Sequence, residues 1–124
     1  MTNMYEQIGG APAVTTVVDD FYRRIMADTE LAWFFAEVDL TRLKALQVEY
    51  FSMLLGGPAE YTGKPLRQAH RGLGITMTHF NRVAAHLAEA LDAAGVPQHL
   101  IVLILSEIVR LADEIVAEGA RAAQ

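Results

Sequence analysis

Residues 64–74 read KPLRQAHRGLG and place His70 on a segment that has room for only about one helical turn. Glycine and proline are frequent from residue 56 to residue 74, whereas the apolar residues on both sides recur at helical spacing. No stretch shows the sustained alternation of a half-buried strand. The sequence therefore predicts an all-α protein in which a short, loop-supported turn presents a histidine.

The length and composition of the chain indicate one domain with a large apolar interior. The chain has 124 residues, and 52% of them are apolar. We expect a single domain over residues 1–124, with frayed ends at residues 1–3 and about 118–124. The absence of cysteine excludes disulfides and thiolate-bound zinc, so histidine, carboxylate or a prosthetic group would have to hold any metal.

Charge and hydropathy argue against two classes of partner. The net charge is −5, and the ten basic residues are scattered along the chain, so nucleic acid is not an expected partner. The N-terminus lacks the pattern of a signal peptide, and no uninterrupted apolar run reaches the roughly 18 residues of a membrane span. These features predict a cytoplasmic protein with no membrane span.

Capping and breaking residues predict where the longer helices begin and end. The expected helices run from a first turn that contains Pro12 to near Ala27, from an N-cap at Thr41 to Gly56, from an N-cap at Thr78 to Gly95, and from Pro97 to Ile115. Between the first two helices, the three aromatic residues at 33–35 cannot all face one direction. This segment is expected to form a corner that packs on more than one side.

Three polar residues in apolar surroundings are candidates for chemistry. A neutral imidazole at His70 could bind iron through one ring nitrogen if a backbone carbonyl held the other, and a helical turn supplies such a carbonyl near Leu66. Gln47 is a lone amide in an apolar helical stripe, so its burial without a partner would be costly. Tyr22 extends an inward-facing stripe, and its hydroxyl also needs a partner.

Each of these residues also has an ordinary structural explanation. His70 could be an interior histidine with satisfied hydrogen bonds, Gln47 a helix-edge amide that reaches water, and Tyr22 a core tyrosine bonded to backbone. Phe34 and Phe35 are likewise compatible with a plain core. Considered together, however, these residues favour a haem pocket.

The other histidines and the common catalytic motifs point to no second site. His79 and His86 lie about 10.5 Å apart along a helix, too far to share one metal ion, and are expected at the border of its apolar face with solvated edges. His99, near the start of the last helix, is expected in solvent. The chain contains no dinucleotide-binding loop and no His-Glu-x-x-His motif, and its few serines do not suggest a hydrolase triad.

Short motifs occur in a fixed order along nearly the whole chain. They are YEQIGG at 5–10, DFY at 20–22, FF at 34–35, LKALQ at 43–47, LGGP at 55–58, YTG at 61–63, HRGLGI at 70–75 and THF at 78–80. In this order they resemble the group I truncated haemoglobins. Each motif is weak alone, but the ordered set is specific and extends from about Met4 to the end of the last helix.

The resemblance implies a globin-like, two-over-two α-helical sandwich that binds haem b. It implies His70 as the proximal iron ligand, Tyr22 as the principal distal hydrogen-bond donor and Gln47 as the second. Phe35 would pack against the haem ring, and Phe51 matches an aromatic residue proposed to gate an apolar ligand tunnel in some members. The other implied cofactor-binding positions are Leu43, Leu46, Tyr61, Leu66, Ile75, Met77, Phe80, Val83, Ile104 and Ile108.

The chain departs from the family's pattern at Leu46, where many relatives carry a basic residue. That residue can neutralise a haem propionate or approach the distal site. In this chain the anchoring of the propionates would depend on other basic residues, and the candidates are Arg42, Lys44, Lys64 and Arg71. The apolar Leu46 also argues against a distal side chain as a sixth iron ligand.

The resemblance implies a protein that binds O₂ and other diatomic gases, including NO and CO, reversibly. An enzymatic function, the oxidation of nitric oxide to nitrate by the ferrous-oxy form with support from a reductase, fits the same pocket. A gas sensor fits less well, because the sequence shows no second domain or output segment. A non-haem helical bundle that binds a partner is the alternative from another class. We expect a monomer or a weak homo-oligomer.

Overall fold

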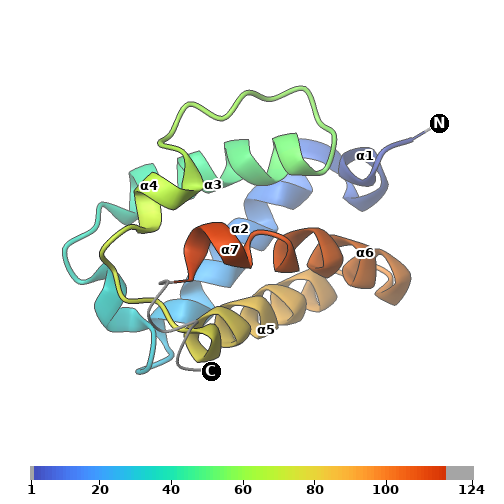
Figure 1. Ribbon diagram of the computed structural model, residues 1–124. Coiled ribbons are helices and arrows are strands. Elements are labelled where there is room, and N and C mark those ends of the chain that lie inside the picture. The colour runs from blue at the N-terminus through green and yellow to red at the C-terminus, as the bar shows by residue number, and fades with distance from the viewer. Residues whose placement is uncertain (1, 117–124) are drawn as a thin grey trace.

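The computed structural model describes residues 2–116 and shows only helices and loops over this part of the chain (Figure 1). The helices are α1 (Met4–Ile8), α2 (Gly10–Met26), the 3₁₀ helix η1 (Ala32–Phe35), α3 (Leu40–Leu54), α4 (Leu66–His70), α5 (Met77–Ala93), α6 (Gln98–Val109) and α7 (Ala112–Ile115). The prediction of an all-α protein is therefore confirmed. The expected fraying at 118–124 lies outside the described residues.

Helix α2 is the centre of the fold, because it packs against both α3 and α5 while α5 also packs against α6. In Figure 1, α2 and α3 form one layer and α5 and α6 the other. The core between them contains the inward residues of α2 and α5 together with the apolar face of α6. Its most deeply buried large side chains are Ile25, Leu31, Ile101, Ile104, Val14 and Val18. Apolar burial of this kind is the main stabilising term of such a fold.

The N-terminal turn is fixed by close contacts between α1 and the chain just after α3. Gly9 ends α1 in a left-handed conformation with φ +117°, which allows the chain to turn directly into α2. A Cβ on Gly57 would lie 2.6 Å from the ring of Tyr5, so only glycine allows this approach. Asn3 accepts a hydrogen bond from the Glu6 amide and donates one to the Gly56 carbonyl at 2.7 Å. The Asn3 side chain thus caps α1 and ties it to the chain just after α3.

Two predicted helix N-caps are each wrong by two residues. Helix α3 has its N-cap at Asp39 rather than Thr41, because the Asp39 carboxylate accepts from the Arg42 amide at 3.2 Å. Helix α5 has its N-cap at Thr76 rather than Thr78. Thr76 accepts from the amide of His79, and the Nδ1 of His79 accepts from the amide of Thr76, each at 3.1 Å. This reciprocal pair is a capping box with histidine in the place usually taken by Glu or Gln.

The last predicted helix is interrupted. Helix α6 ends at Val109, and hydrogen bonds of the i→i−3 type, from Leu111 to Ile108 and from Glu114 to Leu111, tighten the chain before and within α7. The interruption brings α7 against α4, the turn that ends in His70. Of the described residues, none belongs to a helix long and apolar enough to cross a membrane.

Candidate functional site

His70 is the last residue of α4, and its imidazole is oriented by its own helical turn. The Nδ1 atom lies 2.7 Å from the carbonyl oxygen of Leu66, four residues earlier. Because a carbonyl can only accept, Nδ1 carries a proton, and in the neutral ring Nε2 then keeps a free lone pair. The predicted carbonyl partner of His70 is thus confirmed. The half-buried ring presents the tautomer that binds a metal.

Tyr22 is a buried tyrosine whose hydroxyl has no hydrogen-bond partner within residues 2–116. The residue lies on α2 with only 4% of its surface exposed, and burial raises the pKa of its hydroxyl. The group therefore stays protonated at neutral pH and can donate. Its expected structural explanation, a hydrogen bond to backbone, is not found among these residues. Among the described residues the hydroxyl is not one of the fully buried unpaired atoms, so it reaches open space and can donate to a polar ligand there.

Gln47 lies half-buried on α3, and its amide likewise makes no hydrogen bond to the described part of the chain. No hydrogen bond joins Gln47 to Tyr22 either, so both donors remain available. The predicted position of Gln47 on a mainly apolar helix face agrees with its half-buried neighbours Leu43 and Leu46.

Aromatic rings form one wall next to Tyr22. The ring of Phe35 meets the Tyr22 ring edge to face, with centroids 5.9 Å apart and an interplanar angle of 82°. Phe21 contacts the Tyr22 ring at 5.0 Å and the Phe51 ring at 6.2 Å. These contacts hold the phenol ring of Tyr22 from two sides, which fixes the direction of its hydroxyl.

The remaining predicted cofactor-binding residues fall into three groups. The first group is apolar and half-buried, as a partly covered pocket wall requires, and contains Leu43, Leu46, Leu66, Ile75, Met77 and Val83. Fully buried side chains are Phe80, Ile104 and Ile108. Tyr61 is half-buried and donates to the carbonyl of Lys64 at 2.6 Å, so it also holds the loop that leads into α4.

The donor set fits haem better than a metal ion bound by protein alone. Residues 2–116 contain no group of three or more His, Asp or Glu side chains that could hold a metal ion. A single imidazole is sufficient only if a macrocycle supplies the other ligands, as porphyrin does. The half-buried apolar residues of α3, α4 and α5 and the unpaired hydroxyl of Tyr22 are consistent with such a flat, mainly apolar group.

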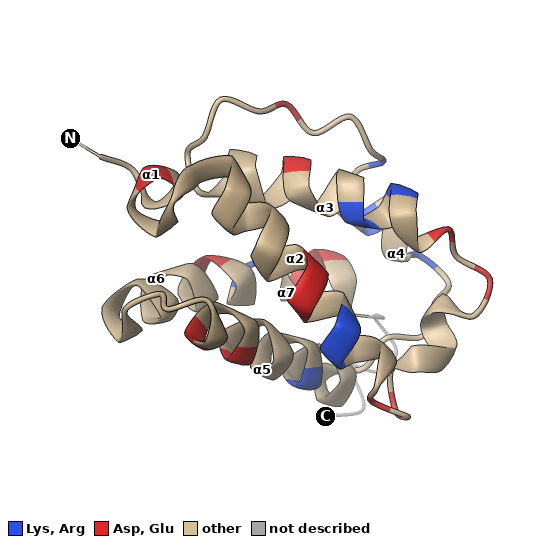
Figure 2. Cartoon of the chain, turned by 180° about the vertical axis from the view of Figure 1, so that it is seen from behind, with Lys and Arg blue, Asp and Glu red and all other residues tan. Residues whose placement is uncertain are grey.

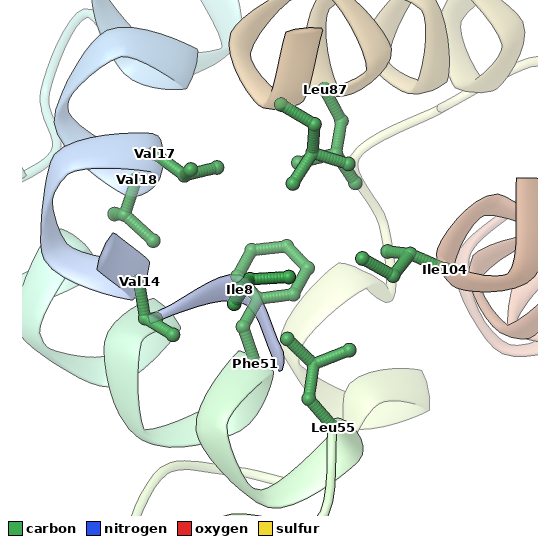
Figure 3. Close-up of a pocket in the computed structure, with 9 residues that line it drawn as sticks. Ile8, Val14, Val17, Val18, Phe51, Leu55, Leu87 and Ile104 are labelled. Atoms are coloured by element: carbon green, nitrogen blue, oxygen red, sulfur yellow. The ribbon is translucent and has the colours of Figure 1, made fainter. Parts of the chain in front are cut away.

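A small apolar cavity lies in the core, lined from five helices (Figure 3). Its volume is about 10 Å³, and its walls are Ile8, Val14, Val17, Val18, Phe51, Leu55, Leu87, Leu91 and Ile104. Figure 3 shows the ring of Phe51 among these side chains, between α2 and α6. A space of this size has room for about one water-sized molecule, and its lining has no polar group to bind water. Such a cavity suits an apolar diatomic gas.

Of the basic candidates for propionate anchoring, Arg42 and Lys44 lie on α3, and Lys64 and Arg71 lie in the loops on either side of α4. Figure 2 shows blue segments on α3 and beside α4. Lys44 already faces the carboxylate of Asp19 on α2 at 3.5 Å. Arg42, Lys64 and Arg71 are exposed and form no ion pair within residues 2–116. These three are therefore the stronger candidates.

A buried ionic cluster at the end of α2 was not predicted from the sequence. Asp28 is 8% exposed, and its carboxylate binds both Arg82 and His86 on α5 and accepts a hydrogen bond from the Glu30 amide at 3.0 Å. The expectation of a solvated edge is therefore wrong for His86, because its Nε2 lies 2.7 Å from Asp28. His79 instead caps α5, and His99 is exposed as expected.

Comparison with known proteins gives the family. The bacterial-like globin family matches residues 3–117. GlbN of Mycolicibacterium paratuberculosis, a group 1 truncated hemoglobin, is 51% identical over 113 residues, which cover 91% of this chain and 83% of that relative. The truncated hemoglobin of Tetrahymena pyriformis in its Fe(III) form superimposes with a TM-score of 0.91 at 30% identity and covers 94% of this chain and 100% of its own.

A further solved structure, the 2/2 hemoglobin from Synechococcus sp. PCC 7002 with covalently attached heme, gives a TM-score of 0.87 at 29% identity. The match covers 92% of this chain and 98% of that one. The predicted two-over-two helical sandwich is thus confirmed. The chain belongs to the bacterial-like globins and, among them, to the group 1 truncated haemoglobins.

Proposed function

We propose that this chain binds haem b through the Nε2 atom of His70 and uses the bound iron to bind O₂ and other diatomic gases reversibly. The observation that carries the proposal is the hydrogen bond from His70 Nδ1 to the Leu66 carbonyl, which leaves Nε2 as the free donor. When bound, haem supplies the iron to which a diatomic gas attaches. The described side chains contribute orientation, hydrogen bonds and exclusion of water.

The distal residues would select among the gases by hydrogen bonding. O₂ takes up more negative charge on binding than CO does, so a fixed donor in a dry pocket stabilises O₂ more. Tyr22 is such a donor, because it is buried and its hydroxyl has no other partner among the described residues. Gln47 would be the second donor. Leu43 and Leu46 would keep water away from the same space.

Two functions of different classes, gas carrier and enzyme, would use this pocket. The chain could store or deliver O₂, or it could oxidise nitric oxide to nitrate with electrons from a reductase. The apolar cavity next to Phe51 supports both, because each needs a route inward for small apolar gases. We propose gas binding as the function and nitric oxide oxidation as its enzymatic extension. We further propose a cytoplasmic protein that is monomeric or weakly self-associating.

The test is the absorption spectrum of the purified protein in ferric, ferrous and CO-bound states. We expect an intense Soret band that copurifies with the chain, is lost in His70→Ala and is kept in the control His99→Ala. A colourless, folded product that ignores added haemin would instead support the alternative, a non-haem helical bundle. Rapid mixing of the O₂-loaded protein with nitric oxide, with nitrate as the measured product, separates the enzyme from the carrier.

A further inference from the structure

The 3₁₀ helix η1 presents an exposed tryptophan that has no role in the proposed pocket. Trp33 is 59% exposed, and its ring stacks on Phe34 with centroids 3.9 Å apart and an interplanar angle of 23°. His79 of α5 contacts the Phe34 ring edge-on at 5.0 Å. A tryptophan held rigidly at the surface is costly to leave in water and is the residue type most enriched at binding hot spots.

The surface around Trp33 combines apolar and acidic side chains. Val38 is also exposed, at 42%, and the exposed charges between α2 and α3 are those of Glu30, Glu37 and Asp39. No Lys or Arg occurs from residue 29 to residue 41. Figure 2 shows this segment with red but no blue, whereas blue lies on the neighbouring α3 and α4. We name Trp33, Val38 and these three carboxylates the acidic corner.

Arg82 on α5, which also feels the charge of Glu30, is already engaged in an ion pair with a buried carboxylate. It binds Asp28 through two hydrogen bonds of 2.9 Å, so its charge is already balanced. Within residues 2–116 the Asp39 carboxylate accepts only the Arg42 backbone amide, as the N-cap of α3, and keeps its negative charge. The acidic corner therefore carries a net negative potential over an exposed apolar centre. A basic protein surface is its electrostatic complement.

The acidic corner lies next to the pocket along the chain and through aromatic contacts. Phe34, beneath Trp33, packs against the core, and its neighbour Phe35 contacts the ring of Tyr22 at 5.9 Å. A partner that docks on Trp33 would therefore lie close to the residue expected to pack against haem. Electron transfer between two proteins requires that their redox groups lie close together.

We propose that the acidic corner docks the basic face of an electron-donating protein, a reduced flavoprotein or iron–sulfur protein, which returns one electron to the haem iron. This inference rests on the proposed function. Conversion of NO and O₂ to nitrate consumes one electron, since NO + O₂ + e⁻ gives NO₃⁻. The donor would lose that electron and be oxidised, and the electron would return the haem iron, when bound, from the ferric to the ferrous state. A contact of this kind is small and transient, which suits a patch of a few residues.

The first test runs the same electron path in reverse. Ferrous protein is mixed without O₂ with ferricytochrome c, a lysine-rich electron-transfer protein, and the second-order rate of cytochrome reduction is measured. The triple variant E30Q/E37Q/D39N removes three charges from the acidic corner, and Asn keeps the N-cap of α3. The control E6Q/E60Q/D92N makes the same three changes at exposed positions outside the acidic corner.

We expect the acidic-corner variant to react at least about 10-fold more slowly than wild type at low ionic strength and about equally at high salt, because steering is screened. The reaction rate of the control triple variant should fall much less. Trp33→Ala should slow the reaction at both salt concentrations, whereas Val109→Ala, which removes another 59% exposed side chain on α6, should not. Equal rates in the two triple variants would overturn the proposal.

The second test locates the docking surface without measuring activity. The paramagnetic cation hexaamminechromium(III) is titrated into the ¹⁵N-labelled, CO-bound ferrous protein. We expect selective broadening of amide signals from residues 30–39 and of the Trp33 indole. Broadening centred on Glu6, Glu60 or Asp92 would overturn the proposal. Concentration-dependent self-association that Trp33→Ala abolishes would also overturn it, because the acidic corner would then bind a second copy of this chain. Normal Soret and CO spectra with either result would leave the proposed function intact.

Discussion

The carboxylate of Asp28, at the end of α2, forms two parallel hydrogen bonds with the guanidinium of Arg82 on α5. Nε lies 2.9 Å from Oδ2, and Nη2 lies 2.9 Å from Oδ1. The Nε2 atom of His86 adds a third contact at 2.7 Å, while its Nδ1 lies 3.2 Å from Glu89 without forming a hydrogen bond. The cluster ties the corner that leads to η1 onto the opposite layer of the sandwich.

We predict that Asp28→Asn removes stability that depends on pH. Hydrogen bonds from Arg82 and then His86 are the main reasons that the pKa of Asp28 lies well below its usual value. A carboxyl with a depressed folded pKa stabilises the protein above its unfolded pKa of about 3.9 and loses that contribution as pH falls through the folded pKa. Wild type should therefore be the more stable protein from pH 5 to 7, and the difference should shrink below about pH 4.

Urea unfolding of both ferric proteins by circular dichroism between pH 3 and pH 7 measures this difference. Asp92→Asn, which changes an exposed carboxylate at the end of α5, is the control and should follow wild type at every pH. Parallel stability curves for wild type and Asp28→Asn would show that the Asp28–Arg82 pair contributes no pH-dependent stability.

We predict that Tyr22→Phe releases O₂ faster with little effect on CO. The change removes one hydrogen bond worth roughly 1–3 kcal/mol, which corresponds to an increase of about 5- to 150-fold in the O₂ off-rate. Because burial raises the pKa of the Tyr22 hydroxyl, the wild-type off-rate should not change between pH 6 and pH 9. Stopped-flow displacement of O₂ by CO measures the O₂ off-rate of each protein and its dependence on pH. Equal off-rates in the two proteins would remove Tyr22 as the distal donor.

The helical pattern and the geometry of His70 could be predicted from the sequence because both depend on neighbours a few residues apart. Apolar spacing located α2, α3 and α5, and the i−4 carbonyl of a single turn located the partner of His70. Tyr22 and Gln47 were found for a similar reason, since each is a polar group in a local apolar stripe. Their roles stay predictions.

The features that were missed depend on contacts that no local pattern contains. Arg82 and His86 lie 54 and 58 residues from Asp28 in the chain, so their burial follows from the packing of α5 on α2. The helix starts were placed late because Thr41 and Thr78 are also good N-cap residues, and Asp39 and Thr76 compete with them. The break after Val109 carries no proline or glycine signal.

We predict that His70→Gly loses haem during desalting and regains a Soret band when imidazole is added. Glycine leaves a space of about one imidazole at the end of α4, and free imidazole can supply the missing nitrogen. The exposed His99 is the matched control, and His99→Gly should retain haem without imidazole. Absorption spectra before and after a desalting column give the result. Full haem retention by His70→Gly would mean that another group binds the iron.

We predict that Val17→Phe slows the association of O₂. Val17 is 5% exposed and lines the small apolar cavity beside Phe51, so a larger ring would fill that space (Figure 3). Overpacking of this kind costs about 1–3 kcal/mol of folding stability, which the fold should tolerate. Thr15→Phe adds the same ring at an exposed position of α2 and is the control. Flash photolysis of the CO-bound protein in the presence of O₂ measures the O₂ association rate. An unchanged rate in Val17→Phe would place the gas route elsewhere, because O₂ could no longer pass through the filled cavity.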